Sequence, residues 1–536
     1  MDKREYLLDM INELVSIPSV TESSCESEPG EWVRGRLAKI KYFKDNPDNM
    51  KWIETPLEGS REKLHSLIVR IDSAAKTNRT ILLMSHYDVV DVDVYGEHAD
   101  LAFDMAGLNE AYNNSGDDVL YGRGVMDMKC SIAIEVDILE EFANDRSMFD
   151  VNIIASFVGD EENSSAGMRG VLPALAAMKA EGLDFLTAVN MEPGEAGDSG
   201  EPGPRVFLGT LGKLMPSVYV RGCAAHVGNC YKGFSSALAA ANIITAAECS
   251  SELADPLHGK CQPSWICLDM DVMRAVYSVT VPDRAYVYFN CFTTTNAPAD
   301  LVRQMRAVAA SAFSKTSEHL SVSCKGLIAK GYDGAEFSPY PPKIFTLDEL
   351  IKRAADNCGA EFEKNLDAFM RSLPSDDMRR RGIKIVDHIA DLTGEEGPYI
   401  VCFFLPPWLP VRTDLTDDGR DVAVVGAVRE IEEELEREHG IKITEVEFFA
   451  GLCDLSYVGA KVSAEDLSDF KRNMPGWGCV YSIPLEEMNS LGMPVVNMGP
   501  SGEDAHKKTE RLYLHYSLDI LPDAVRSLIR KLSERL

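Results

Sequence analysis

The chain has 536 residues, of which 45% are hydrophobic and 26% are charged. This composition excludes a disordered chain, a collagen-like repeat and a small disulfide-held scaffold, and the length predicts two or three domains. The 85 acidic residues outnumber the 54 basic ones and give a net charge of −31, so we expect neither nucleic acid nor an anionic membrane as a partner.

The cysteines and the N-terminal segment indicate a cytoplasmic protein. The thirteen cysteines are scattered and contain no C-x-x-C pair, as is typical of reduced thiols. The first fifteen residues carry acids among apolar positions at helical spacing, which favours an amphipathic helix over a signal peptide. No apolar run reaches the roughly 18 residues that span a bilayer.

From the N-terminus to about residue 212, helical and strand-like patterns alternate. In chain order, the patterns predict a helix at 7–15, strands at 66–71 and 81–85, a helix at 125–142, and strands at 151–158 and 185–189. This alternation predicts an α/β architecture in which helices flank a mostly parallel sheet. Ligands bind at the carboxyl ends of such strands, so the polar residues that directly follow strands are the candidates for a site.

The hydrophobic pattern changes near residue 213 and predicts a smaller α+β domain inserted into the first. Its expected elements are strands at 214–220 and 285–293 and helices at 235–247 and 299–313. The strand at 214–220 alternates as though it were half exposed.

We expect the first domain to comprise 1–212 and 330–536, with the insert at 213–329. The second part includes a charged helical segment at 343–389 and a strand at 399–404 that three following prolines break.

The motif S-H-Y-D-V-V at 85–90 directly follows an apolar strand. A histidine whose ring nitrogen binds a metal needs an acceptor for its other N–H, and an acid two residues later can supply one. His86 is therefore a candidate metal ligand, with Asp88 as the group that orients it. A hydrogen-bonded structural histidine is the alternative for this motif alone.

The motif Y-G-R-G-V-M-D-M-K at 121–129 places two glycines before an acid at the start of a predicted helix. A tight turn there would direct Asp127 into a cleft. The alternative is a glycine-rich loop whose aspartate caps the helix.

Three further candidates lie in polar segments. F-V-G-D-E-E-N at 157–163 places Glu161 and Glu162 after a buried strand, where one acid can bind metal and its neighbour can act as general base. Glu192 follows another apolar run, and His506 lies in the loop G-E-D-A-H-K-K-T-E-R. For each of them the alternative is an ordinary solvated residue.

Together these residues make a set of nitrogen and oxygen ligands for two divalent cations. The set consists of His86, Asp127, Glu162, Glu192 and His506. Imidazole and carboxylate ligands without thiolate suit Zn²⁺, with Co²⁺ or Mn²⁺ as substitutes.

The five motifs, in this order and spacing, resemble the co-catalytic dizinc metallopeptidase family of acetylornithine deacetylase, succinyl-diaminopimelate desuccinylase, aminoacylase and glutamate carboxypeptidase. L-V-S-I-P-S-V at 14–20 and R-G-C-A-A-H-V-G at 221–228 extend the resemblance over nearly the whole chain. The segment 343–389 and D-L-S-Y at 454–457 resemble, within that family, the RocB-like arginine-utilisation proteins. The resemblance implies a zinc-exopeptidase-like catalytic domain and an inserted lid domain through which a homodimer can form.

The same resemblance implies how the ligands are shared between two zinc ions. His86, Asp127 and Glu192 would hold one ion. Asp127, Glu162 and His506 would hold the other, so that Asp127 bridges the two.

Catalytic roles are implied by the resemblance in the same way. Asp88 would orient a ligand histidine, and Glu161 would act as general base. His226 of the lid, from the same subunit or from a dimer partner, would polarise the scissile carbonyl. The implied reaction is hydrolysis of an amide or peptide bond in a small peptide or an N-acyl amino acid.

Substrate recognition and activity leave alternatives open. The lid strand at 288–293, Y-F-N-C-F-T, contains no arginine to bind a substrate carboxylate, and Arg284 and Arg511 are substitutes for it or else surface charges. A non-catalytic binding or regulatory protein with the same fold is the alternative to an enzyme, although the intact metal and base positions count against it.

Overall fold

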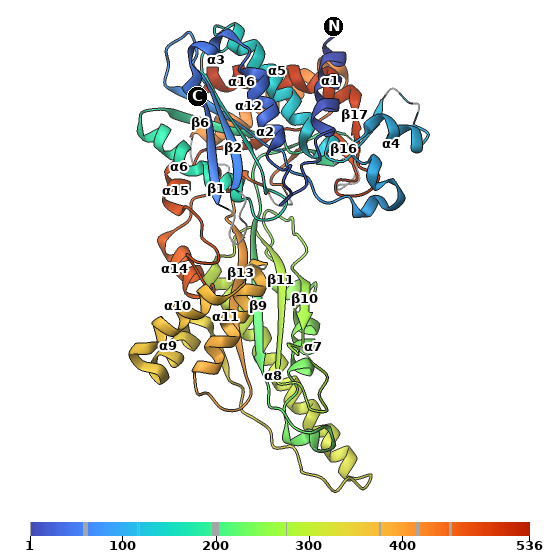
Figure 1. Ribbon diagram of the computed structural model, residues 1–536, viewed down its shortest axis with the longest axis vertical. Coiled ribbons are helices and arrows are strands. Elements are labelled where there is room, and N and C mark those ends of the chain that lie inside the picture. The colour runs from blue at the N-terminus through green and yellow to red at the C-terminus, as the bar shows by residue number, and fades with distance from the viewer. Residues whose placement is uncertain are drawn as a thin grey trace. The chain divides into compact units, whose positions relative to one another are not determined.

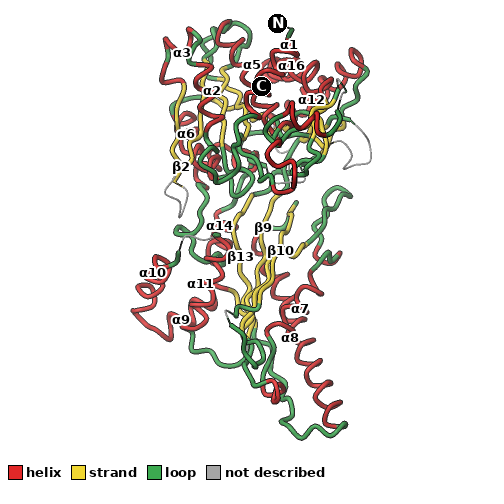
Figure 2. Tube along the Cα trace, turned by 45° about the vertical axis from the view of Figure 1, so that its right-hand side comes forward, coloured by secondary structure: helices red, strands yellow, loops and turns green. Residues whose placement is uncertain are grey.

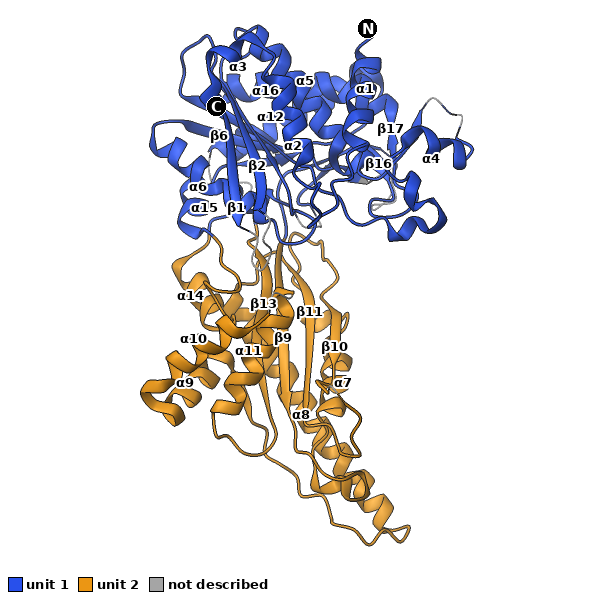
Figure 3. Ribbon diagram, viewed as in Figure 1, with its two compact units in different colours: residues 1–211, 412–461, 484–536 blue, residues 212–411, 462–483 orange. Residues whose placement is uncertain are grey.

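A computed structural model describes residues 2–56, 63–114, 116, 118–195, 203–274, 276–374, 377–413, 419–449 and 453–536 (Figure 1). The chain forms two compact units (Figure 3). Unit 1 comprises Met1–Leu211, Arg412–Lys461 and Pro484–Leu536, and unit 2 comprises Gly212–Val411 and Val462–Ile483. Unit 2 begins next to the expected start of the insert, but it extends beyond the expected end at 329 and includes the charged segment 343–389.

Unit 1 is built on an eight-stranded sheet with the strand order β1-β2-β5-β3-β6-β15-β8-β14. In that order the strands are β1 (Met50–Pro56), β2 (Lys63–Ile71), β5 (Asn152–Val158), β3 (Arg79–His86), β6 (Asp184–Asn190), β15 (Val495–Asn497), β8 (Arg205–Phe207) and β14 (Thr444–Val446). Pairing is parallel from β5 through β3 and β6 to β15, and again between β8 and β14. The α/β prediction with a mostly parallel sheet is confirmed.

Helices cover both faces of this sheet (Figure 1). On one face lie α1 (Lys3–Val15), α5 (Cys130–Asn144), α12 (Gly419–His439) and α16 (Leu521–Arg535), and on the other lie α6 (Ala166–Ala180), α13 (Leu455–Gly459) and α15 (Leu485–Leu491). Shorter helices are α2 (Glu28–Leu37), α3 (Lys41–Asp45) and α4 (Met105–Ala111). Because both faces are covered, the central strands β3, β5 and β6 are buried along almost their whole length.

The helix expected at 125–142 begins five residues later than predicted, at Cys130. Residues Val125–Lys129 form an irregular turn in which Asp127 and Met128 have non-helical backbone angles. This turn carries one of the predicted ligands.

A second, four-stranded sheet of unit 1 has the order β4-β17-β16-β7. Its strands are β4 (Val119–Tyr121), β17 (Arg511–Tyr513), β16 (Ser501–Glu503) and β7 (Gly194–Glu195). It joins three segments that are distant in the sequence, around residues 120, 194 and 501–513.

Unit 2 is built on a five-stranded sheet with the order β10-β11-β9-β13-β12 (Figure 2). Its strands are β10 (Trp265–Asp271), β11 (Arg284–Thr293), β9 (Gly212–Arg221), β13 (Tyr399–Leu409) and β12 (Ile344–Thr346). The helices are α7 (Ser236–Ala247) and α8 (Pro298–Ile328) on one face, α9 (Leu347–Cys358), α10 (Phe362–Ser372) and α11 (Met378–Leu392) on the other, and α14 (Ala464–Arg472), which packs on α8.

Two local predictions for unit 2 are wrong. The strand at 214–220 is buried rather than half exposed, because β9 lies between β11 and β13 with helices on both faces. The strand at 399–404 continues through Pro406 and Pro407 to Leu409, and its register with β9 shifts after Leu405.

All thirteen cysteines are free thiols. Within the described ranges, none of the helices is both long enough and apolar enough to cross a bilayer.

Candidate metal centre

Three of the predicted ligands follow neighbouring strands of the eight-stranded sheet. His86 is the last residue of β3, Glu162 lies in the turn after β5, and Glu192 lies two residues after β6. β3 pairs in parallel with β5 on one side, where His86 is opposite Val158, and with β6 on the other. The carboxyl ends of the three strands therefore meet at one edge of the sheet, where an α/β fold binds its ligands.

The four-stranded sheet brings the other two ligands to the same place. β4 leads into the turn that carries Asp127, and His506 lies between β16 and β17, which pair with each other. β17 also pairs with β4, so the His506 loop lies beside the Asp127 turn. β7, which begins two residues after Glu192, pairs with β16 and ties that ligand to the same sheet.

The Asp127 turn needs a glycine at its start. Gly124 has a φ of +74°, and a Cβ atom there would lie 2.6 Å from Cγ1 of Val89. Asp127 does not cap α5, whose N-cap residue is Lys129. The turn therefore directs the aspartate away from the helix.

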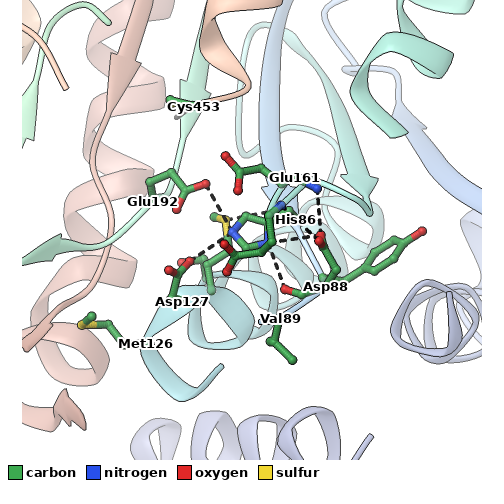
Figure 4. A network of polar contacts seen from close by, with 12 residues as sticks. His86, Asp88, Val89, Met126, Asp127, Glu161, Glu192 and Cys453 are labelled. Carbon is green, nitrogen blue, oxygen red and sulfur yellow. Dashed lines mark hydrogen bonds and ion pairs between the residues drawn. The ribbon is translucent and has the colours of Figure 1, made fainter. Parts of the chain in front are cut away.

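Asp127 lies between two histidines and turns one carboxylate oxygen toward each. Its Oδ1 lies 3.1 Å from Nε2 of His86, and its Oδ2 lies 3.2 Å from Nε2 of His506. Oε1 of Glu192 lies 3.4 Å from the same nitrogen of His86, and Oε2 of Glu162 lies 3.1 Å from that of His506. Figure 4 shows Asp127 and Glu192 on one side of the His86 ring. The five residues form two groups of three that share Asp127, and in each group the ligand atoms lie within 4.8 Å of one another.

Asp88 connects His86 to the turn that carries Glu161 and Glu162 (Figure 4). Nδ1 of His86 lies 3.1 Å from the main-chain carbonyl oxygen of Asp88 and 3.5 Å from its Oδ1. The Asp88 carboxylate accepts hydrogen bonds from the main-chain N–H groups of Glu161 and Glu162, each at 3.2 Å, and from the hydroxyl of Thr21 at 3.0 Å. The nearer acceptor for the histidine is thus the main chain, and the carboxylate fixes the next turn.

Two residues at the centre adopt left-handed backbone angles that are uncommon outside glycine. Asp160, in the turn before Glu161, has a φ of 62°, and His506 has a φ of 65°. The Asp160 turn is held by hydrogen bonds to its carboxylate from the Ser164 hydroxyl at 2.5 Å and the Ala166 N–H at 2.9 Å. Such conformations cost on the order of 1–3 kcal/mol and are typical of functional sites.

Burial and mutual contacts shift the pKa values of the centre. Burial raises the pKa of Glu161 well above its usual range, and burial with repulsion from Asp127 raises that of Glu162 to about 7. Hydrogen bonds to Asp127 and Glu162 outweigh burial and raise the pKa of His506 to about 11. Burial favours neutral Asp127, but hydrogen bonds to His506 and His86 outweigh it and hold that pKa well below its usual range. A divalent ion would compete with the histidine protons for the same lone pairs.

The residues present fit two divalent cations. Six carboxylates gather here, and none of them pairs with a lysine or arginine in the part of the chain that the structure describes; they are Asp88, Asp127, Glu161, Glu162, Glu192 and Asp454. Buried carboxylates in this number need compensating positive charge, and two divalent ions would neutralise most of theirs. Three protein ligands for each ion, one of them shared, leave positions open for water and substrate.

Three other predicted residues are not among the candidate ligands. His226 belongs to unit 2, where it is exposed and its Nδ1 accepts a hydrogen bond from the Gly228 N–H at 3.1 Å. Arg284, also in unit 2, pairs with Asp387 at 2.8 Å. Arg511 pairs with Asp504 at 2.6 Å, so both arginines already bind a carboxylate.

Three buried charged residues beside the centre were not predicted. Asp454 is 4% exposed, and its charge couples to those of His86 and Glu192. Arg123 and Glu510 form an ion pair in which each side chain is 1% exposed. All three lie inside motifs that were already quoted from the sequence. Their charge within those motifs was the sequence signal that could have identified them.

Comparisons with known proteins agree with this arrangement. The model of peptidase family M20/M25/M40 matches residues 82–533, a range that includes all five candidate ligands. Uncharacterized protein YqjN of Bacillus subtilis is 29% identical over 541 residues, which cover 97% of this chain and 95% of YqjN. Protein RocB of the same organism is 23% identical, with 97% of this chain and 94% of RocB covered. Among solved structures, the M20 family metallo-carboxypeptidase Sso-CP2 from Sulfolobus solfataricus has the same fold, with a TM-score of 0.53, 13% identity and coverage of 99% of this chain and 100% of that one.

Proposed function

Because the chain belongs to peptidase family M20/M25/M40 and is a hydrolytic enzyme that acts on peptide or amide bonds, we propose that it is a dizinc amidohydrolase. Its substrate is a small peptide or an N-acyl amino acid. The observation that carries the proposal is the pair of three-residue groups that share Asp127, with one oxygen turned toward each histidine.

This geometry supports an assignment of the ligands to the two ions. His86, Asp127 and Glu192 would hold one ion, and Asp127, Glu162 and His506 the other. Zn²⁺ suits the mixture of imidazole and carboxylate, and Co²⁺ or Mn²⁺ can replace it. Two such ions would supply the Lewis acidity that acidifies water and polarises an amide carbonyl.

Glu161 serves as the general base of the proposed reaction. It accepts a proton from the attacking water, whose oxygen forms a bond to the carbonyl carbon. When the C–N bond breaks, Glu161 returns that proton to the leaving nitrogen. Asp88 holds this glutamate at the centre through its main-chain N–H, at 3.2 Å.

His226 is proposed to polarise the scissile carbonyl, either within its own subunit or across a homodimer. An arginine-containing dipeptide or N-acyl arginine is the first substrate to test, because the sequence resembles the RocB-like arginine-utilisation proteins. The thirteen free cysteines support a reducing, cytoplasmic location.

The proposal is tested by metal analysis combined with a substrate screen. Protein purified without chelator should bind two divalent ions per chain and, with Zn²⁺, Co²⁺ or Mn²⁺ supplied, hydrolyse at least one dipeptide or N-acyl amino acid. The Glu161→Gln variant should retain both ions and lose at least a thousandfold in kcat, because an amide cannot take the proton. The matched control is Glu181→Gln, an exposed glutamate after α6, which should keep normal turnover. Normal turnover by Glu161→Gln, or a wild-type protein that binds no divalent ion, would contradict the proposal.

A further inference from the structure

A buried ion pair beside the centre joins two segments that carry metal ligands. Nη1 of Arg123 lies 2.6 Å from Oε2 of Glu510, and both side chains are 1% exposed. Removing two charges from water costs several kcal/mol per ion, so a buried pair is a weak source of stability. Its contacts point to another role.

Glu510 holds the turn that carries the bridging aspartate. Its Oε1 accepts hydrogen bonds from the main-chain N–H groups of Met126 and Asp127, each at 3.4 Å. These are the two peptide groups directly before the Asp127 side chain. The position of that side chain therefore depends on Glu510.

Arg123 holds the loop that carries His506. Its Nη2 donates to the main-chain carbonyl oxygen of His506 at 3.3 Å and to that of Asp91 at 3.2 Å. The guanidinium also lies over the ring of Tyr95, 5.1 Å from its centroid. The arginine is thus fixed on several sides, and the His506 main chain is fixed to it.

The two ion positions depend on this pair to different degrees. The group of His86 and Glu192 is supported by β3 and β6 of the large sheet. His506 lies in a loop, is half exposed and has left-handed backbone angles, so its position rests on main-chain contacts.

We propose that Arg123 and Glu510 are a positioning pair that sets the separation of Asp127 and His506. The pair therefore strengthens binding of the ion held by Asp127, Glu162 and His506 more than binding of the ion held by His86, Asp127 and Glu192. The inference rests on the proposed function, because it needs two bound ions. Neither residue touches the substrate or the ions in this role.

Calorimetric titration of the metal-free full chain with Zn²⁺ tests the proposal. In Glu510→Gln and Arg123→Met, the second ion should bind at least tenfold more weakly. The ion at the His86 group, which shares Asp127 but keeps His86 and Glu192 on β3 and β6, should lose less than about threefold in affinity. Arg123→Lys keeps the charge but cannot make all the guanidinium contacts, so it should give a smaller loss. If Glu510→Gln gives too little folded protein, the two arginine variants carry the test.

The matched control is Asp137→Asn, which breaks another buried ion pair of unit 1. Asp137 is 2% exposed and pairs with Arg526 and with Lys3. This variant should lose melting temperature as the others do, yet bind both ions with wild-type affinity. The proposal is overturned if the Arg123 and Glu510 variants bind both ions normally, or if Asp137→Asn shows the same selective loss. A wild-type protein that binds no ion at all contradicts the proposed function instead.

Discussion

Asp127 is the residue on which the whole candidate centre depends, because its two oxygens serve both histidines. His86 and Glu192 lie on one side of it, and His506 and Glu162 on the other. Neighbouring residues position these ligands partly through hydrogen bonds to the main chain of the ligand-bearing turns. Asp88 and Glu510 both accept hydrogen bonds from main-chain N–H groups beside the ligands.

Replacing His506 should remove one ion and keep the other. His506→Ala deletes the only nitrogen ligand of the second group, whereas the His86 group stays complete. We expect metal analysis after dialysis to find about one ion per chain, and activity to fall at least a hundredfold. His515→Ala is the control, since His515 lies nearby in the sequence, is 66% exposed, pairs with Asp519 and belongs to neither candidate ligand group. Two ions retained in His506→Ala would exclude this ligand.

Glu26, a buried acid behind Asp88, should make stability fall as the pH rises. Burial, with repulsion from Asp88 and Asp160, raises its pKa to about 9. In the unfolded chain its pKa is about 4.5, so folding takes up a proton between these two values, and stability is lost across that window as the pH increases. Glu26→Gln removes this loss.

At pH 8 the Glu26→Gln variant should be more stable than the wild type by on the order of 5 kcal/mol, and below pH 4 the difference should vanish. Urea unfolding at several pH values measures it. Glu31→Gln, at an exposed position in α2, serves as the control and should show no such trend. A constant difference at all pH values would contradict the assignment.

Three of the predicted residues stand at or just after the ends of apolar strands, whereas Asp127 and His506 were predicted from motifs in a glycine-rich turn and a polar loop. His86, Glu161 and Glu192 stand where strand periodicity ends, so a local pattern points to them. Asp454 and Glu510 are buried acids in loops, where no periodicity distinguishes them from the many solvated acids of this chain. Their burial depends on segments that are hundreds of residues away.

At the scale of elements, the boundaries were predictable where the core imposes a continuous apolar pattern. The strand expected at 151–158 spans Asn152–Val158 in the structure. The helix expected at 299–313 continues to Ile328 as α8. The extension was not predicted, because the residues after Phe313 are mostly polar and carry no apolar repeat. The extent of unit 2 has a similar cause, since β13 pairs with β9 from far along the chain and that pairing leaves no local signal.

The segment after β15 packs so closely on the Glu192 loop that only glycine fits. A Cβ atom at Gly499 would lie 2.1 Å from the carbonyl oxygen of Glu192 and 2.3 Å from that of Met191. Gly499→Ala should therefore cost about 1–3 kcal/mol of unfolding free energy and weaken the ion held by His86, Asp127 and Glu192.

Thermal unfolding and Zn²⁺ titration of Gly499→Ala measure both effects. Gly35→Ala is the control, because a Cβ atom on that exposed position of α2 meets nothing within 4 Å. It should raise stability by about 0.5–1 kcal/mol, as alanine does in a helix. Equal stability changes of the same sign in the two variants would contradict the packing argument.

At the scale of the whole molecule, all five candidate ligands belong to unit 1, so metal removal should affect the two units differently. An ion present at a hundred times its Kd stabilises the folded state by about 2.7 kcal/mol. Chelation should therefore lower the melting temperature, and adding Zn²⁺ should restore it.

Hydrogen exchange shows which part of the chain is destabilised when the metal is removed. After chelation, amides near residues 86, 127, 162, 192 and 506 should exchange faster, whereas those of β9 and β11 in unit 2 should keep their rates. Unchanged exchange around the ligands would contradict a metal centre in unit 1.

The chain leaves unit 1 at Leu211, returns at Arg412, and leaves it a second time between Lys461 and Pro484. On the ribosome, all five strands of the unit 2 sheet are therefore made before β14 and β15 complete the large sheet. Until residues 495–497 emerge, the nascent protein carries β6 without its β15 neighbour, and an unpaired strand edge invites aggregation. The three candidate ligands of one ion have all been translated once Glu192 is made, whereas the other group waits for His506, so we expect the second ion to bind only after most of the chain has been synthesised.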